Sequence, residues 1–255
     1  MRQGPLKCLI YGAPGVRKTL HALTVGEVGQ IMDLDGGVEC ALGSTRLFPA
    51  DKYNEDRLKV DLLQYPERES MTKADAYENF FKHLLAIANL TLPNATQKYP
   101  YKVLIIDSFT TLCDCAMRYV LRNTGRLNRP VDVKSNITQP EWGLMINEVE
   151  KCVTLIRGMD LHVLLLAHSV PVKNDNGAIV KHEISIPTQR LPPRIPAYFD
   201  ELWYYETQPG NGPREVLIKT TNSFLYDAKS RAGLRDGTST SIGMKEIFKS
   251  LGREL

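Results

Sequence analysis

A short run near the amino terminus combines glycines, a lysine and a threonine at a spacing that suits phosphate binding. The run comprises Gly12, Ala13, Pro14, Gly15, Val16, Arg17, Lys18, Thr19 and Leu20. It meets three of the four fixed positions of G-x-x-x-x-G-K-[ST], and Arg17 stands where the second glycine is expected. In this pattern backbone N–H groups surround phosphate oxygens, the lysine reaches the β and γ phosphates, and the hydroxyl binds Mg²⁺. We therefore expect a site for ATP and Mg²⁺, with hydrolysis less secure than binding because of Arg17.

The flanking sequence favours this interpretation over a glycine-rich turn that arose by chance. An apolar segment, Leu6–Tyr11, precedes the run, and a helix-forming segment, Lys18–Val28, follows it. A strand before the loop and a helix after it are what the motif requires.

A second oxygen ligand for Mg²⁺ is expected at the end of another apolar run. Asp107 follows Val103–Ile106, where a buried strand would present the carboxylate to a metal bound beside the phosphates. An aspartate that caps the next helix is the competing interpretation, and Ser108 is equally available as a cap. We expect Thr19 and Asp107 to hold the metal.

Hydrolysis also needs a group that orients the attacking water, and a carboxylate just beyond a neighbouring strand could serve. The candidates are Asp33, Asp35 and Glu39. We prefer Asp35, because Gly36 and Gly37 let the backbone come close to bound nucleotide. Turn carboxylates exposed to solvent are the alternative.

His168 follows the apolar run Leu161–Ala167, which predicts a strand that ends at the nucleotide site. Its side chain could sense the γ phosphate there. A strand-end histidine bonded to backbone is the alternative. The expected catalytic residues are Lys18, Asp35, Asp107 and His168.

The elements that must position these residues follow from the apolar runs, which predict a mostly parallel central sheet flanked by helices. The expected strands are Leu6–Tyr11, Gln30–Met32, Lys102–Asp107 and Leu161–Ala167, and then a C-terminal antiparallel hairpin of Glu201–Tyr205 and Glu215–Thr220 around Gln208–Pro213. The expected helices are Lys18–Val28, Lys73–Leu90, Thr110–Arg122 and Pro140–Arg157. Two long segments, Asn123–Gln139 and Val170–Pro196, stay unassigned, and loops of such length are usually functional or disordered. The fold class is therefore α/β.

Composition sets outer limits on these expectations. The 255 residues suit a single α/β domain over residues 1–255, and 43% hydrophobic with 24% charged residues is ordinary for a globular protein. We expect a cytoplasmic protein without a membrane span, because no apolar run approaches about 20 residues and no secretory signal opens the chain. Five irregularly spaced cysteines fit reduced thiols. The net charge of +3 does not by itself imply nucleic-acid binding.

Taken in order, these features resemble the RecA-like ATPase core of P-loop NTPases, and most closely the compact phage-encoded single-strand annealing or recombinase ATPases of that superfamily. The resemblance runs from about Leu6 to Arg231. Its carriers are Gly12–Thr19, Asp33–Gly37, Leu104–Ser108, Glu141–Gly143, Leu165–His168 and Lys229–Arg231. Only the first and third are specific alone, and the ordered set is the stronger signal. A phage-encoded protein would act in the host cytoplasm.

The resemblance implies roles for residues beyond the phosphate loop. The acidic residue after the second strand is usually a glutamate in that superfamily, so Asp35 is one methylene shorter than the family's residue. The residue at the place of His168 links the γ phosphate to a following DNA-binding loop, here Val170–Pro196. That loop would contact single-stranded DNA through Lys173, Lys181, Arg190 and Arg194. A merely solvated loop is the alternative.

Assembly is also implied by the resemblance. RecA-like subunits often present cations to the nucleotide of a neighbouring subunit, and the matching residues are Lys219, Lys229 and Arg231. A basic surface pair is the alternative for the last two. We expect a homo-oligomer, either a ring or a filament, held together by the core itself or with the help of DNA or a partner.

Three functions are consistent with these expectations. The first is an ATP-dependent enzyme that assembles on single-stranded DNA and promotes annealing or strand exchange, with a single-strand DNA-binding protein as a further partner. The second is a module in which bound ATP gates assembly with little hydrolysis. The third is a P-loop loader that acts through protein contacts, without affinity of its own for DNA.

Overall fold

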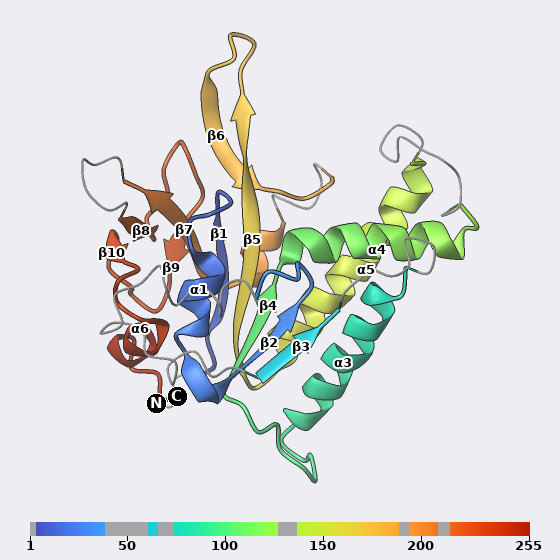
Figure 1. The fold of residues 1–255 in the computed structure, drawn as a ribbon, viewed down its shortest axis with the longest axis horizontal. Helices are drawn as coiled ribbons and strands as arrows, with labels where there is room; N and C mark the ends of the chain where they lie inside the picture. Colours follow the sequence, from blue (N-terminus) through green and yellow to red (C-terminus); the bar gives the residue numbers. More distant parts are fainter. Residues whose placement is uncertain (1–3, 39–60, 66–73, 127–136, 189–193, 209–214) are drawn as a thin grey trace.

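The computed structural model describes residues 4–38, 61–65, 74–126, 137–188, 194–208 and 215–255 (Figure 1). Its strands are β1 (Lys7–Gly12), β2 (Gly29–Asp33), β3 (Asp61–Gln64), β4 (Val103–Asp107), β5 (His162–Lys173), β6 (Ile179–Ile184), β7 (Glu201–Thr207), β8 (Val216–Lys219), β9 (Lys229–Ser230) and β10 (Thr238–Ser239). Its α-helices are α1 (Lys18–Leu23), α3 (Ala76–Leu90), α4 (Phe109–Asn123), α5 (Gln139–Gly158) and α6 (Met244–Ser250), with 3-10 helices η1 (Gly26–Val28) and η4 (Ile195–Tyr198).

The central sheet has the order β10-β8-β7-β1-β5-β4-β2-β3. The six strands from β7 to β3 in this order run parallel, whereas β8, β9 and β10 are antiparallel additions at the C-terminal end of the chain. The predicted α/β class, with a mostly parallel sheet and a C-terminal antiparallel hairpin, is confirmed. Because the carboxyl ends of parallel strands lie at one edge, residues that end different strands are brought together there.

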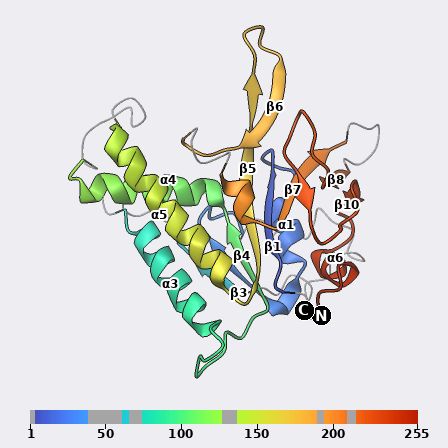
Figure 2. The same ribbon diagram turned by 180° about the vertical axis from the view of Figure 1, so that it is seen from behind.

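Two apolar cores lie on opposite faces of the sheet. One core packs α3, α4 and α5 against the sheet and contains Phe80, Phe109 and Val149. The other contains Leu23 and Phe248. Helices α3, α4 and α5 cover one face of the sheet, and α1 and α6 lie on the other (Figures 1 and 2). Full burial of one such side chain contributes about 1.5–3 kcal/mol to folding. No helix in the described part of the chain is long and apolar enough to cross a membrane.

The helix after the phosphate loop is shorter than predicted. The sequence predicts a helix over Lys18–Val28, but α1 ends at Leu23 and a turn leads into η1. Gly26 takes φ 72°, a left-handed conformation that stops a right-handed helix, and β-branched Thr24 and Val25 precede it. The helix expected from Lys73 begins at Ala76 in α3, and Lys73 itself lies outside the described residues.

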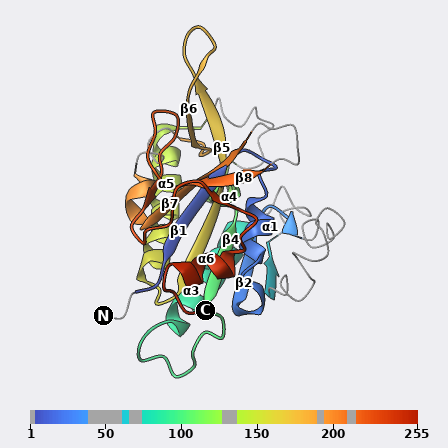
Figure 3. The same ribbon diagram turned by 90° about the vertical axis from the view of Figure 1, so that its left-hand side faces the viewer.

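The segment after Ala167 is a hairpin, which corrects its interpretation as a loop. Strand β5 does not end at Ala167 but continues to Lys173, and it pairs with antiparallel β6 from Ser169 onward. The connecting turn is held by Asn174, whose side chain accepts hydrogen bonds from two backbone N–H groups, and it includes Gly177 at φ 76°. The hairpin projects well beyond the body of the molecule (Figures 1 and 3).

Candidate nucleotide-binding site

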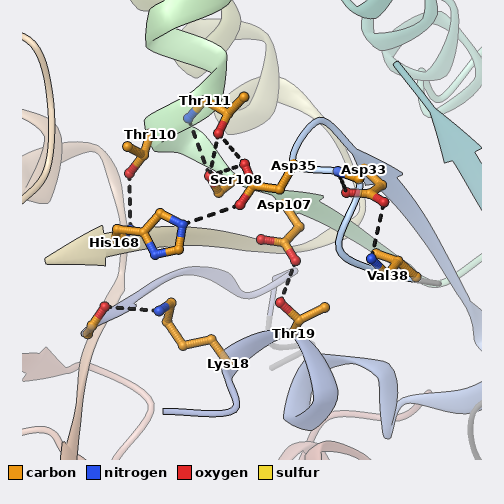
Figure 4. Close-up of polar contacts among 12 residues, drawn as sticks. Lys18, Thr19, Asp33, Asp35, Val38, Asp107, Ser108, Thr110, Thr111 and His168 are labelled. Atoms are coloured by element: carbon orange, nitrogen blue, oxygen red, sulfur yellow. Dashed lines mark hydrogen bonds and ion pairs between the residues drawn. The ribbon is translucent and has the colours of Figure 1, made fainter. Parts of the chain in front are cut away.

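Polar residues from four parallel strands meet at the carboxyl edge of the sheet. Gly12 at the end of β1 is in register with His168 in β5. Asp33 at the end of β2 is in register with Asp107 at the end of β4. Since β5 lies between β1 and β4, His168 is placed between the phosphate loop and Asp107 (Figure 4).

Lys18 points back over the phosphate loop at the start of α1. Its side chain is buried, and its Nζ donates hydrogen bonds to the carbonyl oxygens of Gly12 at 2.9 Å and Ala13 at 3.0 Å. Burial lowers the pKa of Lys18 to about 8, while the negative charges of Asp107 and Asp35 act in the opposite direction. The ammonium group is therefore held at the loop by acceptors that a phosphate would replace.

The two unusual features of the loop backbone are Gly12 and Arg17. A Cβ atom at Gly12 would lie 2.8 Å from the carbonyl oxygen of Tyr205, so the close approach of β7 requires glycine. Arg17 caps α1 in the left-handed conformation, with φ 63° and ψ 25°. The backbone thus adopts the glycine-type conformation at this position although the residue is arginine, which costs about 1–2 kcal/mol.

Thr19 and Asp107 present two oxygens to each other across the site. The Oγ1 of Thr19 donates a hydrogen bond to Oδ2 of Asp107 at 2.5 Å. Burial raises the pKa of Asp107 to about 6, although the hydrogen bond from Thr19 acts in the opposite direction. A hydroxyl and a carboxylate are ligands that suit Mg²⁺, whose charge would offset the cost of burying the ionised Asp107. The residues present therefore fit the metal.

The helix-capping alternative for Asp107 does not hold. Ser108 occupies the N-cap position of α4, and its Oγ accepts a hydrogen bond from the backbone N–H of Thr111 at 3.3 Å. The carboxylate of Asp107 is therefore left to face Thr19 and Lys18 (Figure 4).

Asp35 accepts hydrogen bonds from three side chains. Its Oδ1 accepts from Ser108 at 3.0 Å and from Thr111, and its Oδ2 lies 3.3 Å from Nε2 of His168. Burial alone would raise the pKa of Asp35, but the hydrogen bonds from His168, Thr111 and Ser108 prevail and lower it. The hydroxyls of Ser108 and Thr111 were not predicted as site residues, although Ser108 directly follows the predicted strand that ends at Asp107 and Thr111 stands four residues after that aspartate.

The other two candidate carboxylates differ from Asp35. Asp33 accepts hydrogen bonds from the backbone N–H groups of Gly36 at 2.8 Å and Val38 at 3.2 Å, so it holds its own turn. Burial raises the pKa of Asp33 despite these bonds. Glu39 lies outside the described residues. Among the described carboxylates that follow β2, only Asp35 reaches His168.

His168 lies within β5 and not after its end. Its backbone N–H donates to Oγ1 of Thr110 at 3.0 Å, and its Nε2 faces Asp35. Its Nδ1 and the Oγ of Ser169 are buried and have no hydrogen-bond partner among the described residues. Two consecutive residues thus carry unsatisfied polar atoms at the point where β5 leaves the sheet for the hairpin.

The expected DNA-binding cations are divided between two places. Lys173 is exposed near the hairpin turn, and Lys181 in β6 lies 2.8 Å from a carboxylate oxygen of Asp227. Arg194 instead precedes η4 and pairs with Glu150 of α5 at 3.3 Å. The fourth residue, Arg190, lies outside the described residues.

The expected trans-acting cations all contact groups of their own chain. Lys219 lies 3.3 Å from Glu206 within the β7–β8 hairpin. Lys229 donates to the carbonyl oxygen of Pro196 at 2.7 Å, and burial lowers its pKa. Arg231 pairs with Asp200 at 3.1 Å. The Arg231 side chain is 68% exposed and that of Lys219 only 16%, so Arg231 is the more accessible of the two.

The chain was compared with protein-family models and with solved structures. Residues 4–232 match the family model described as AAA domain, AAA_24. A solved structure of the RadB recombinase matches at 12% identity with a TM-score of 0.47, over 92% of this chain and 86% of that one. A KaiC-like protein from the archaeon Pyrococcus horikoshii matches at 16% identity with a TM-score of 0.45, over 92% and 84%.

No curated protein matches the sequence significantly. The family match covers most of the chain and includes the phosphate loop, Asp107 and His168. The chain therefore belongs to the AAA domain family AAA_24, and it is a P-loop ATPase.

Proposed function

We propose that this protein is an ATP-dependent enzyme that binds single-stranded DNA, assembles on it, and promotes annealing or strand exchange. One observation carries the proposal: β5 runs without interruption from the nucleotide site into the projecting hairpin. The same strand thus carries His168, which faces Asp35, and Lys173, which is exposed near the turn. A change at the nucleotide can reach the hairpin through a few residues of one strand.

The nucleotide half of the proposal assigns a role to each residue at the sheet edge. Lys18 would exchange its two carbonyl acceptors for phosphate oxygens, and Thr19 with Asp107 would hold Mg²⁺. The metal, when bound, neutralises charge on the β and γ phosphates. Asp35 would orient the attacking water, because its lowered pKa keeps the carboxylate ionised and the residue is exposed beside His168.

Coupling to the hairpin would act through His168. A γ phosphate near Nε2 would compete with the carboxylate of Asp35 for this nitrogen. The Nδ1 of His168 and the Oγ of Ser169 lack hydrogen-bond partners among the described residues, and buried polar atoms are more stable when bonded. A second conformation of these two residues, in which they find partners, would therefore be favoured once His168 leaves Asp35. Loss of γ phosphate would restore the first arrangement, so the hairpin would respond to hydrolysis.

The DNA half rests on the two hairpin cations. A strand of DNA that tracks the hairpin would place phosphates near Lys173 and Lys181. Lys181 would have to leave Asp227, a surface ion pair worth about 0–1 kcal/mol. This cost is small, so the pair restrains Lys181 without preventing a phosphate contact.

Assembly would place the exposed Arg231 at the nucleotide of a neighbouring subunit. Its ion pair with Asp200 is exposed on both sides and would exchange readily for a phosphate. Lys229 and Lys219 could contact the neighbouring nucleotide only after breaking their contacts with Pro196 and Glu206, respectively. A single-strand DNA-binding protein is the further partner that we propose.

A second candidate function is a module in which bound ATP gates assembly with little turnover. The observation that favours it is the full set of hydrogen bonds on Asp35, which lowers its basicity and occupies both oxygens. A water molecule would have to displace a hydroxyl or His168 before Asp35 could orient it.

The deciding experiment measures ATP turnover and DNA mobility shift in parallel, with and without single-stranded DNA. The variants are Lys18→Ala, which removes the phosphate-binding cation, and the double change Lys173→Ala with Lys181→Ala, which removes the hairpin cations. Lys82→Ala is the matched control, because Lys82 is an exposed, ion-paired lysine on α3, away from the hairpin.

We expect DNA-stimulated turnover in the natural chain and loss of DNA binding in the double variant but not in Lys82→Ala. DNA binding that survives in the double variant would contradict the hairpin assignment. Nucleotide-dependent oligomers with negligible turnover would favour the gated module. No DNA binding at low salt by the natural chain would leave a loader that acts through protein contacts, which is the third function.

A further inference from the structure

A buried histidine stands three residues after Lys18 in the helix that follows the phosphate loop. The side chain of His21 is 2% exposed, and both of its ring nitrogens are paired. Its Nδ1 lies 2.5 Å from the hydroxyl of Tyr205, and its Nε2 lies 2.8 Å from the carbonyl oxygen of Ile242. A carbonyl oxygen only accepts hydrogen bonds, so Nε2 carries the proton and Nδ1 accepts from the Tyr205 hydroxyl.

This arrangement fixes one neutral form of the imidazole. A second proton on Nδ1 would reverse the hydrogen bond with Tyr205, because the hydroxyl would then have to accept from His21 and not donate to it. Burial lowers the pKa of His21 to about 4, while the bond to Ile242 and the charge of Glu246 act in the opposite direction. His21 is therefore neutral, and its two ring nitrogens join Tyr205 to Ile242; it does not act as an acid or base.

Each group that His21 contacts has a second link to the phosphate loop or to α1. Tyr205 in β7 is in register with Gly12, and its carbonyl oxygen is the atom that a Cβ at Gly12 would meet. Beyond Ile242, the backbone N–H of Met244 donates to Oγ1 of Thr24 at 2.6 Å, and Thr24 Oγ1 in turn donates to the carbonyl oxygen of His21 at 2.6 Å. His21 therefore links three parts of the chain: its own helix α1, strand β7 through Tyr205, and the C-terminal segment through Ile242.

The C-terminal segment that contains Ile242 lies outside the family match, which ends at residue 232. The C-terminal segment, residues 233–255, adds β10 to the β8 edge of the sheet and places α6 beside α1 (Figure 1). It is anchored independently at its far end, where the ring of Phe248 packs edge-on against His162 with centroids 5.0 Å apart. The segment therefore contacts α1 from a fixed position.

Helix α1 needs such support more than most helices. It has six residues, and isolated helices shorter than about 12 residues are marginal in water. Its side-chain N-cap is absent, since Arg17 makes no side-chain capping bond there. The direction in which Lys18 and Thr19 face the phosphates is therefore set by what α1 packs against.

We propose that His21 is a positioning residue for the nucleotide site, and that it makes the C-terminal segment part of that site's support. Tyr205 and Ile242 hold the imidazole, the imidazole holds α1, and α1 holds Lys18 and Thr19 in their phosphate-facing orientation. The proposal rests on nucleotide binding at the phosphate loop and not on DNA binding, so the two can fail separately.

The central variant is Tyr205→Phe, which removes one hydroxyl and leaves the ring beside Gly12. Its matched control is Tyr77→Phe in α3, where an equally buried tyrosine donates to Glu148 on the opposite face of the sheet. Tyr205 is 1% exposed and Tyr77 is 2% exposed, so both variants leave a buried site without its hydroxyl. Thermal unfolding and the Kd for a fluorescent ATP analogue are measured for each, well below the unfolding temperature.

We expect both tyrosine variants to lower Tm, but only Tyr205→Phe to weaken nucleotide binding, by roughly 10-fold, because displaced phosphate ligands lose contacts together. His21→Leu should weaken binding at least as much, and the double variant with Tyr205→Phe should be no weaker than His21→Leu. His21→Gln, which keeps a donor toward Ile242, should recover part of the affinity.

A wild-type Kd in Tyr205→Phe and His21→Leu, with Tm lowered in both, would overturn the proposal and reduce His21 to a stability role. Equal loss of affinity in Tyr77→Phe would overturn it too, since any loosening of the fold would then suffice. Lys18→Ala tests the site itself: if this variant binds as the natural chain does, the phosphate loop is not where the analogue binds, and it is the nucleotide assignment that fails.

Discussion

The hydroxyl of Thr19 donates to the carboxylate of Asp107 at 2.5 Å, across the gap between the phosphate loop and β4. Two residues that are 88 positions apart in the chain are therefore brought to one point by the parallel sheet. The same hydrogen bond partly stabilises a buried carboxylate whose ionised form is costly, since burial raises the pKa of Asp107 to about 6. A site that is costly without its ligand is typical of positions kept for function.

Asp107→Asn should therefore stabilise the nucleotide-free protein and weaken its response to Mg²⁺. The amide keeps an oxygen for Thr19 but removes the buried charge, so Tm without nucleotide should rise. The further rise of Tm on addition of ATP with Mg²⁺ should be mostly lost, because the metal loses its charged ligand. Thermal unfolding with and without the two ligands checks both parts. A full Mg²⁺-dependent rise in the variant would remove Asp107 from the metal site.

Arg17→Gly should increase the free energy of unfolding by up to about 1 kcal/mol. Arginine at φ 63° carries the left-handed penalty that glycine avoids, and part of the gain is offset by the greater freedom of glycine in the unfolded chain. The contacts of the Arg17 side chain are also lost, which reduces the gain. Urea denaturation measures the change.

The matched variant for Arg17→Gly is Ala74→Gly, because Ala74 is the other non-glycine residue with positive φ in the described part of the chain. Relief of the backbone penalty at position 74 should leave nucleotide affinity unchanged. If Arg17→Gly changes affinity or turnover and Ala74→Gly does not, the effect belongs to the phosphate loop. A destabilised Arg17→Gly variant would show that the arginine contacts outweigh the backbone penalty.

The site residues that could be predicted from the sequence belong to short contiguous motifs. Gly12, Lys18 and Thr19 form a contiguous motif, and Asp107 closes an apolar run, so both could be placed at strand ends without knowledge of long-range pairing. Asp35 faces His168, whereas Asp33 accepts a hydrogen bond from its own turn, and the role of Asp35 in orienting water stays a prediction. Which carboxylate turns inward depends on the turn backbone, which spacing alone does not reveal.

The parts that were missed depend on distant partners. The β5–β6 hairpin was not predicted, because Pro171 and the basic residues obscure the alternation of polar and apolar residues that indicates strands. The turn Asn174–Gly177 nevertheless contains an Asn-Gly pair, which is typical of hairpin turns. Helix α6 and its C-cap have Met244, Ile247, Phe248 and Leu251 at helical spacing, but the contact of α6 with α1 follows only from the fold.

Acidification should destabilise the natural chain more than His21→Gln. The imidazole is neutral in the fold, with a pKa lowered to about 4, whereas in the unfolded chain it titrates near 6.5. Unfolding therefore takes up a proton below pH 6.5, and stability falls as the pH is lowered from 6.5 to 4, by on the order of 3 kcal/mol in total. Tm measured from pH 7 to pH 5 should decline more steeply in the natural chain.

His162 has a similarly lowered pKa and remains in both proteins, so the His21→Gln curve should flatten without becoming level. The difference between the two curves isolates His21, because the other titrating groups are common to both. Parallel curves would mean that His21 is protonated at little cost in the fold, which would contradict its placement between Tyr205 and Ile242.

The hairpin cations should govern the salt dependence of DNA binding. Each phosphate contact to a single strand contributes about 0.7 to the slope of log K against log salt concentration. Lys173→Ala should lower the slope by about this amount, because Lys173 is exposed and forms no ion pair with the described residues. Mobility shifts at several salt concentrations measure the slope, and an unchanged slope would remove Lys173 from the DNA contact.

Asp227→Asn should tighten the binding of single-stranded DNA. The carboxylate of Asp227 lies 2.8 Å from Nζ of Lys181, so it competes with a phosphate for the same cation. The backbone carbonyl of Asp227, which accepts a hydrogen bond from Tyr11 at 2.6 Å, is retained in the variant. Release of an exposed pair is worth about 0–1 kcal/mol, which corresponds to a gain in affinity of up to about 5-fold.

Any loss of a negative charge favours DNA, so the control must change net charge equally at a distant place. Glu78→Gln does so on α3, where Glu78 pairs with Lys82 and Arg122. Tightening by Asp227→Asn that exceeds the control, and that disappears when Lys181→Ala is added, would assign the effect to Lys181. Equal tightening in the two single variants would reduce it to net charge, and the hairpin would then lose its claim to a specific phosphate contact at that residue.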